Sequence, residues 1–274
     1  PTIWLAILDY LDAHKGEYDL SALRYMTVGG SAAPESMIRA FEERHGLRIM
    51  QGWGMTELSP VGSFTSDRPQ TATSTSVERQ RYRATAGQPL PFVDVRARSD
   101  DGLVPWDGQT MGELEVRGPW VAGAYHGGAG EESFTADGWF RTGDIVTIGP
   151  NAELVIQDRC KDLVKSGGEW ISSVLLETYL MGHPQVAEAA VIAVPHPQWL
   201  ERPLAVVVPR AGQLPDVDEL RAFVGAQFAK WWVPDAIVFA ESLPKTGTGK
   251  VMKLALRDTY REQYQVVTVQ ALSS

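Results

Sequence analysis

The sequence predicts a mixed fold, of class α/β and α+β, with a parallel α/β subdomain, a small antiparallel β-barrel subdomain and a carboxyl-terminal α+β domain. Strand and helix patterns alternate as far as Met50, and a period of two runs from Phe92 to Ile156. Mixed patterns return after Arg159. We therefore expect domains at residues 1–90, 91–159 and 160–274.

The first region alternates helix and strand. Apolar residues at 3–11 recur at helical spacing, and a short apolar strand follows at 23–28. Pro34 suits the first turn of a helix, where its missing N–H breaks no hydrogen bond, and Gly46 ends that helix. A strand at 47–50 then completes a parallel arrangement, in which ligands gather at the carboxyl ends of strands.

The rest of the chain divides by periodicity. Residues 66–86 are rich in Ser, Thr and Arg without apolar periodicity, which predicts a long surface loop. The segments FVDVRAR, GELEVRG and 139–148 predict strands separated by glycine turns, in a small antiparallel barrel or sandwich. Beyond residue 159 we expect helices at 172–181 and 216–229, the latter with Asp216 and Glu219 at capping-box spacing, and strands at 186–194 and 203–208.

Composition excludes several classes of protein. The chain has 25 basic and 34 acidic residues, a formal net charge of −9, which disfavours binding to nucleic acid or anionic membranes. Cys160 is the single cysteine and allows no internal disulfide. No apolar run approaches the roughly 20 residues that span a bilayer. We expect a cytoplasmic protein without a transmembrane segment.

Two common catalytic signatures fit poorly. Gly249 and Lys250 are followed by Val251 where a Walker loop needs Ser or Thr, and neither GxGxxG, CxxC nor HExxH occurs. Gly29-Gly30-Ser31 lies between a strand and a helix as a nucleophile elbow would, which leaves a serine hydrolase using Ser31 as an alternative. Pro34 weakens that alternative because it starts the helix three residues after the serine.

Four segments occur in a distinctive order: GWGMTE (52–57), GWFRTGD (138–144), DRCKDLVKSGGEWISSVLLE (158–177) and PKTGTGK (244–250). This set resembles the adenylate-forming (ANL) superfamily of acyl-CoA synthetases, aryl-CoA ligases, luciferases and carrier-loading adenylation domains. The blocks GGSAAP (29–34) and GELEVRG (112–118) fit the same resemblance. The segment SGGEWISS is most similar to the corresponding segment of bacterial fatty-acyl-CoA ligases.

The resemblance implies an ATP-dependent, AMP-forming acyl-CoA synthetase of fatty acid metabolism. Such an enzyme converts a carboxylic acid, ATP and CoA through an acyl-adenylate, with Mg²⁺ as cofactor, and a homodimer is one assembly that it allows. Residues 1–90 would be only the remainder of a larger α/β domain, and residues 160–274 would form a mobile domain. A carrier-protein-loading adenylation domain and a non-catalytic remnant are the alternatives.

The resemblance also implies roles in nucleotide binding. Thr56 would bind the α-phosphate of ATP, Glu57 would hold Mg²⁺, which prefers carboxylate oxygen, and Asp144 and Arg159 would bind the ribose. The adenine side would be lined by Ser31, Gln51, Gly52 and Trp53. Trp53 stands where the family usually has Tyr, and it could instead line the acyl pocket or pack in the core.

Further roles fall in the last domain. Lys250 would bridge the attacking carboxylate and the α-phosphate, although a solvated basic helix is the alternative for this region. Lys161 occupies the family's hinge position, where one residue takes up the change in φ and ψ. Gly167 and Gly168 would let the pantetheine arm of CoA pass, flanked by Trp170.

The chain departs from the family in two further respects. Asp158 precedes Arg159 where glycine is commoner, and nothing matches the Ser/Thr/Gly-rich loop, ending in Pro-Lys-Gly, that binds the β- and γ-phosphates. The chain also starts at Pro1 without an initiator methionine. We therefore expect the carboxyl-terminal half of a longer ligase, inactive in acid activation by itself.

Overall fold

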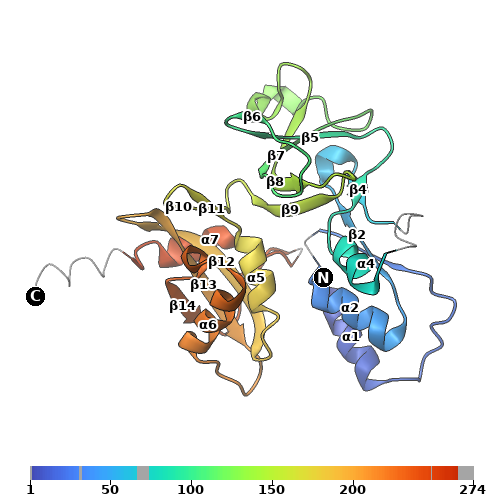
Figure 1. The fold of residues 1–274 in the computed structure, drawn as a ribbon, viewed down its shortest axis with the longest axis vertical. Helices are drawn as coiled ribbons and strands as arrows, with labels where there is room; N and C mark the ends of the chain where they lie inside the picture. The colour runs from blue at the N-terminus through green and yellow to red at the C-terminus, as the bar shows by residue number, and fades with distance from the viewer. Residues whose placement is uncertain (1, 31–32, 67–73, 248, 265–274) are drawn as a thin grey trace, which may run out of the picture. The chain divides into compact units, whose positions relative to one another are not determined.

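The computed structural model of the chain describes residues 2–30, 33–66, 74–247 and 249–264. The chain divides into two compact units, Pro1–Gln157 and Asp158–Ser274 (Figure 1). The first unit contains two sheets and the second unit one. The finer division at residue 90 stays a prediction.

The first sheet has the order β1-β2-β3-β4, and only its β1–β2 pair is parallel. Pro34 precedes α2 and Gly46, at φ 66°, ends it, as expected from the sequence. Ile38 and Phe41 of that helix are fully buried in a core that α1, β1 and β2 complete. The elements are α1 (Thr2–Ala13), β1 (Met26–Val28), α2 (Glu35–His45), β2 (Ile49–Trp53), β3 (Ser63–Phe64) and β4 (Gln88–Pro89).

A helix, α4 (Ser76–Arg83), replaces part of the loop predicted at 66–86, so that prediction was wrong for this part. Thr75 and Glu78 form a capping box: the Thr75 hydroxyl accepts from the Glu78 N–H, and the Glu78 carboxylate accepts from the Thr75 N–H. The helix packs through polar residues, because Arg83 is 3% exposed and lies 2.8 Å from Glu42 of α2. A search for apolar periodicity cannot detect such a helix.

The second sheet has the order β6-β5-β7-β8-β9 and is an open sheet, so the predicted barrel is wrong. Its edge strand β6 has only two residues, too few backbone groups to close a barrel against β9. Leu114, Val116 and Val146 are fully buried on its packed face. The strands are β5 (Asp94–Ser99), β6 (Gly102–Leu103), β7 (Gly112–Arg117), β8 (Phe140–Ile148) and β9 (Leu154–Arg159).

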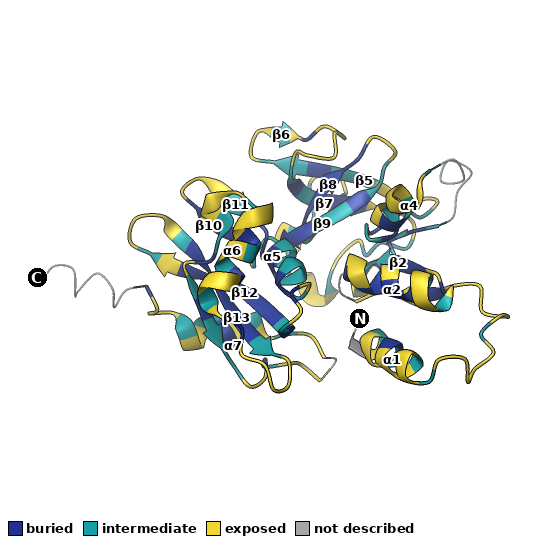
Figure 2. Ribbon diagram, turned by 60° about the horizontal axis from the view of Figure 1, so that its bottom comes forward, coloured by how far each residue is buried: buried dark blue, intermediate teal, exposed yellow. Residues whose placement is uncertain are grey.

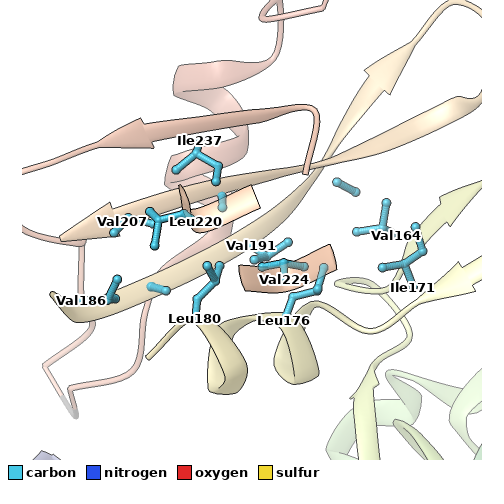
Figure 3. Packing of buried hydrophobic residues seen from close by; sticks show 13 residues of the cluster. Val164, Ile171, Leu176, Leu180, Val186, Val191, Val207, Leu220, Val224 and Ile237 are labelled. Atoms are coloured by element: carbon cyan, nitrogen blue, oxygen red, sulfur yellow. The ribbon is translucent and has the colours of Figure 1, made fainter. Parts of the chain in front are cut away.

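The second unit has a sheet of order β11-β10-β13-β12, with β14 paired to β13. Its two long strands are buried on both faces (Figure 2). Val191 and Val207 pack against α5 and α6 (Figure 3), whereas Ile192 and Val206 pack on the face that includes Leu256 of α7. The elements are β10 (Val164–Ser166), β11 (Glu169–Ile171), α5 (Ser173–Leu180), β12 (Val186–His196), β13 (Leu200–Pro209), α6 (Val217–Gln227), β14 (Ala236–Phe239) and α7 (Lys253–Tyr260).

Short 3-10 helices connect several of these elements: η1 (Thr56–Leu58), η2 (His126–Gly128), η3 (Glu131–Ser133) and η4 (Lys230–Trp232). At the start of α6, the Asp216 carboxylate accepts from the N–H groups of Asp218 and Glu219, which satisfies two otherwise unpaired donors. Within the described ranges, every helix is too short or too polar to cross a membrane.

Candidate active site

The carboxyl end of β2 carries Gln51, Gly52 and Trp53. The Gln51 side chain is 6% exposed, accepts from the Ala33 N–H (2.7 Å) and donates to the Thr85 carbonyl (3.0 Å). These bonds engage both ends of its amide, so Gln51 fixes the loops beside the strand. Ser31, also predicted on the adenine side, lies outside the described residues.

Two glycines of the GWG sequence permit close backbone packing. A Cβ atom on Gly52 would lie 2.8 Å from the Phe64 ring, and one on Gly54 would lie 2.0 Å from the Pro60 carbonyl oxygen. Any larger residue at either position would displace the chain after β2. The glycines therefore place Trp53 and the residues that follow it.

Trp53 and Asp144 meet, although 91 residues separate them in the sequence. The indole Nε1 donates to Asp144 Oδ2 over 2.8 Å, and Asp144 is 2% exposed at the middle of β8. The ring packs at the edge of the β-rich core, where a Cβ on Gly62 would lie 2.6 Å from it. This packing favours the core interpretation of the indole, with its polar edge directed to the predicted ribose-binding carboxylate.

Glu57 lies in η1, which the fully buried Leu58 anchors. Its Oε1 accepts a hydrogen bond from the Tyr125 hydroxyl over 2.6 Å, and its carbonyl accepts from the Ala122 N–H over 2.7 Å. The bond to Glu57, followed by burial, raises the pKa of Tyr125 to about 12. Side chain and backbone of Glu57 are thus both fixed by the 122–125 segment.

The setting of Glu57 fits a magnesium ion. Mg²⁺ usually binds proteins through one or two carboxylates and completes its shell with water and substrate phosphates. Among the described residues no group of three or more His, Cys, Asp or Glu side chains is placed to hold a metal. Thr56, beside Glu57, is exposed and carries a hydroxyl that can reach a phosphate.

Two of the remaining predicted residues lie at the start of the second unit. The Arg159 N–H donates to its neighbour Asp158 over 2.8 Å. Lys161 is exposed, and its carbonyl accepts from the guanidinium of Arg257 over 3.1 Å. The predicted hinge residue is therefore held by α7.

Gly167 and Gly168 form the turn of the β10–β11 hairpin, both exposed and both with positive φ, 60° and 89°. The Gly167 N–H donates to the Trp199 carbonyl over 2.9 Å, and a Cβ on Gly167 would lie 3.1 Å from the Trp199 ring. Trp170, half-buried, lies in β11 after the turn. The turn therefore exposes backbone that carries no side chains, and the Trp199 ring lies next to it.

Lys250 is exposed in a loop whose ends pair through Lys245 and Val251. Thr246 closes the loop: its N–H donates to the Lys250 carbonyl over 2.8 Å, and its hydroxyl accepts from the Lys250 N–H over 3.2 Å. The side chain of Lys250 is thus presented to solvent from a defined turn.

The predicted residues that the structure describes divide between the two units. Gln51, Gly52, Trp53, Thr56, Glu57 and Asp144 belong to the first unit, and Arg159, Lys161, Gly167, Gly168, Trp170 and Lys250 belong to the second. Tyr125 was missed from the sequence, because a single tyrosine in a glycine-rich segment carries no signal of a partner 68 residues away.

Comparison with known families gives two matches on this one chain. Residues 1–126 match the AMP-binding enzyme family, and residues 175–250 match the AMP-binding enzyme C-terminal domain. The chain therefore belongs to the adenylate-forming superfamily of AMP-binding enzymes, as the sequence motifs indicated.

Within that superfamily the chain is similar to acyl-CoA ligases. It is 49% identical to a long-chain-fatty-acid–CoA ligase of Thermus thermophilus and 44% identical to a 3-methylmercaptopropionyl-CoA ligase of Ruegeria pomeroyi, over 96% of this chain in both cases. These alignments cover 49% and 48% of the two relatives. The chain spans about half the length of the curated relatives it matches.

Solved structures give the same result. An amide bond synthetase of Marinactinospora thermotolerans is 32% identical, with a TM-score of 0.78 over 92% of this chain and 51% of that one. The ATP-bound MatB of Rhodopseudomonas palustris is 29% identical, with a TM-score of 0.76 over 87% of this chain and 46% of that one. The fold is thus that of adenylating enzymes.

Proposed function

We propose that this chain is part of an AMP-forming acid–CoA ligase. The ligase activates a carboxylic acid with ATP to acyl-AMP and pyrophosphate, and it then transfers the acyl group to CoA with release of AMP. The observation that carries the proposal is the pair of family matches on one chain, the first of which includes Trp53 and the tethered Glu57. We place the enzyme in the cytoplasm and leave its assembly, including a homodimer, as a prediction.

In the first step, an oxygen of the acid attacks the α-phosphorus and pyrophosphate leaves, so negative charge redistributes over the phosphoryl oxygens. Thr56 donates its hydroxyl to the α-phosphate, and Asp144 accepts from the ribose hydroxyls beside the indole N–H of Trp53. Glu57 holds Mg²⁺, which supplies positive charge to the phosphates when bound. The fixed orientation of Glu57 by Tyr125 supports this role.

Lys250 supplies the mobile positive charge of this step. Its ammonium bridges the incoming carboxylate and the α-phosphate, and it stabilises both as charge moves between them. Exposure at the end of a closed turn supports the role, because a long side chain on a defined loop can reach a ligand that it does not contact at rest. Arg159 donates to the ribose.

In the second step, the CoA thiol attacks the acyl carbonyl and AMP leaves. The Gly167–Gly168 turn admits the pantetheine arm, because backbone without side chains leaves room for a narrow ligand. Trp170 flanks the arm, and Lys161 is the hinge that lets one domain serve both steps. The fatty or related acyl chain of the substrate is inferred from the relatives' acids, long-chain fatty acid and 3-methylmercaptopropionate.

The test is K250A in a ligase of full family length that contains this chain. We expect acid-dependent exchange of pyrophosphate into ATP to fall by at least about 100-fold, whereas thioester formation from supplied acyl-adenylate stays near the wild-type rate. Equal loss of both steps would contradict the role of Lys250. The matched control is K245R, a change on the same loop that keeps the charge.

Two alternatives make different predictions. A carrier-loading adenylation domain would form the acyl-adenylate without turning over CoA, so a product assay with CoA separates it from the ligase. A serine hydrolase would label at Ser31 with a serine-directed phosphonate, in the absence of ATP. The isolated 1–274 chain is expected to form no acyl-CoA, because it lacks a match to the triphosphate loop.

A further inference from the structure

Two basic residues of α7, Lys253 and Arg257, lie four positions apart and so share one face of the helix. Lys253 Nζ lies 2.7 Å from Glu177 Oε1 and donates to the Ser173 hydroxyl over 2.6 Å. Its side chain is only 13% exposed. This first residue of α7 is therefore a largely covered cation in contact with two side chains of α5, which does not fit the solvated basic helix that was the sequence alternative.

The contacts of Lys253 continue to the segment that contains Arg159. The Ser173 hydroxyl accepts from Lys253 and donates to Asp158 Oδ2 over 2.6 Å, and the Ser173 N–H donates to the same oxygen. Ser173 is fully buried and Asp158 is 1% exposed. Asp158, immediately before Arg159, is thus joined to α7 through one hydroxyl.

Electrostatics make Lys253 necessary to this cluster. Burial raises the pKa of both Asp158 and Glu177, and the ammonium of Lys253 opposes the rise in each. Glu177 Oε1 also accepts from the Val191 N–H over 2.7 Å, which fixes it to β12. Without Lys253, two buried carboxylates would share a site with no cation between them, an arrangement that costs stability.

Arg257 holds the other end of the same segment. Its Nη2 donates to the Lys161 carbonyl over 3.1 Å and pairs with the Asp162 carboxylate. The backbone supports this geometry, since the N–H groups of Asp162 and Leu163 both donate to the Arg159 carbonyl over 2.9 Å. Residues 158–162 are therefore attached to α7 at both ends.

We propose that Lys253 and Arg257 are positioning residues, which attach residues 158–162, here called the hinge segment because they contain the predicted hinge residue Lys161, to the helix that follows Lys250. Lys250 lies three residues before Lys253, so the contacts of Lys253 also link the residues next to Lys250 to the hinge segment. The inference rests on the proposed function for the roles of Lys250 and Lys161, whereas the attachment itself is a property of the contacts. A rotation of the backbone at Lys161 would either break the hydrogen bond from Arg257 or move Arg257 together with Lys161.

The attachment is tested on the 1–274 chain by amide hydrogen exchange of the peptide that covers residues 158–163. In K253M and R257Q we expect exchange at Asp162 and Leu163 at least about tenfold faster than in the wild type. The control is K245M, which breaks a lysine–glutamate pair of 2.7 Å between Lys245 and Glu188, away from the hinge segment. Unchanged exchange in R257Q, or equal acceleration in K245M, would overturn the attachment.

The positioning role is tested in a ligase of full family length that contains this chain. K253M should lower the kcat of adenylation about 10- to 100-fold, because displaced reacting groups cost rate. Thioester formation from supplied acyl-adenylate should fall less, and K253R should restore most of the rate. Equal loss in both half-reactions would overturn the role, whereas a wild-type enzyme without ligase activity would contradict the proposed function instead.

Discussion

The indole Nε1 of Trp53 donates a hydrogen bond of 2.8 Å to Oδ2 of Asp144, which joins the end of β2 to the middle of β8. A hydrogen bond to a buried carboxylate is stronger than one between neutral groups. The pair therefore fixes the predicted ribose-binding carboxylate of Asp144 against the predicted nucleotide-binding residue Trp53.

A double-mutant cycle of W53F and D144A measures this pair. Each single change should lower the free energy of unfolding, and the coupling between them should be about 1.5–3 kcal/mol, the usual contribution of a hydrogen bond to a charged group. Urea denaturation of the wild-type 1–274 chain, W53F, D144A and the double mutant gives the four free energies of unfolding that the cycle needs. Additive effects would show that the two side chains do not interact.

The Tyr125–Glu57 bond predicts a dependence of stability on alkaline pH. The pKa of Tyr125 is raised to about 12, whereas a tyrosine in an unfolded chain titrates near about 10. Above pH 10 the unfolded chain loses a proton that the folded chain keeps. The stabilisation is therefore complete below about pH 10 and is lost as the pH rises to about 12.

Y125F tests this pH dependence. Urea unfolding at about pH 9 and about pH 11 should show a smaller alkaline loss of stability in Y125F than in the wild type. Between about pH 7 and pH 9 the free energies of unfolding of the two proteins should change with pH by the same amount, which serves as the internal control. An identical alkaline loss in both proteins would mean that Tyr125 does not carry the raised pKa.

Sequence patterns predicted those elements whose formation depends on nearest neighbours. Pro34 and Gly46 bound a helix because each fixes a local backbone conformation, and the alternation in GELEVRG became β7. The open edge of the second sheet was not predictable, because barrel closure depends on whether β6 and β9 pair over a long sequence distance. Periodicity describes one strand and not its partner.

Within the candidate site, motifs located Glu57 and Lys161 but not the side chains, Tyr125 and Arg257, that hold them. Tyr125 and Arg257 act through long-range contacts, which leave no periodic pattern in the chain. The sequence left a solvated basic helix open as the alternative for the region of Lys253, since composition cannot distinguish a surface lysine from one that contacts Glu177 and Ser173. Such contacts follow from the packing of α7 on the sheet.

The helix α4 gives a test of local capping in a polar segment. T75A removes the side-chain acceptor of the capping box and should lower the free energy of unfolding by about 1 kcal/mol. T75S keeps the hydroxyl and should behave like the wild type in the same urea titration. Equal stability of T75A and T75S would mean that the box contributes nothing.

Leu200, at the start of β13, is the basis of the last prediction. Its φ is 69°, in the left-handed region, and its side chain is 69% exposed, so it contributes little packing there. A leucine in this conformation costs roughly 1–2 kcal/mol. Glycine adopts it without that cost but adds about 0.4–1 kcal/mol of unfolded-state entropy.

L200G should therefore raise the free energy of unfolding by about 0.5–1 kcal/mol, the difference between these two effects. The matched control is L214G, since Leu214 is 74% exposed in a loop and is not among the described residues with positive φ. L214G relieves no backbone strain and only adds conformational entropy to the unfolded chain, so it should be less stable than the wild type. Thermal unfolding of both variants decides the matter, because a lower Tm for L200G would show that Leu200 is not strained.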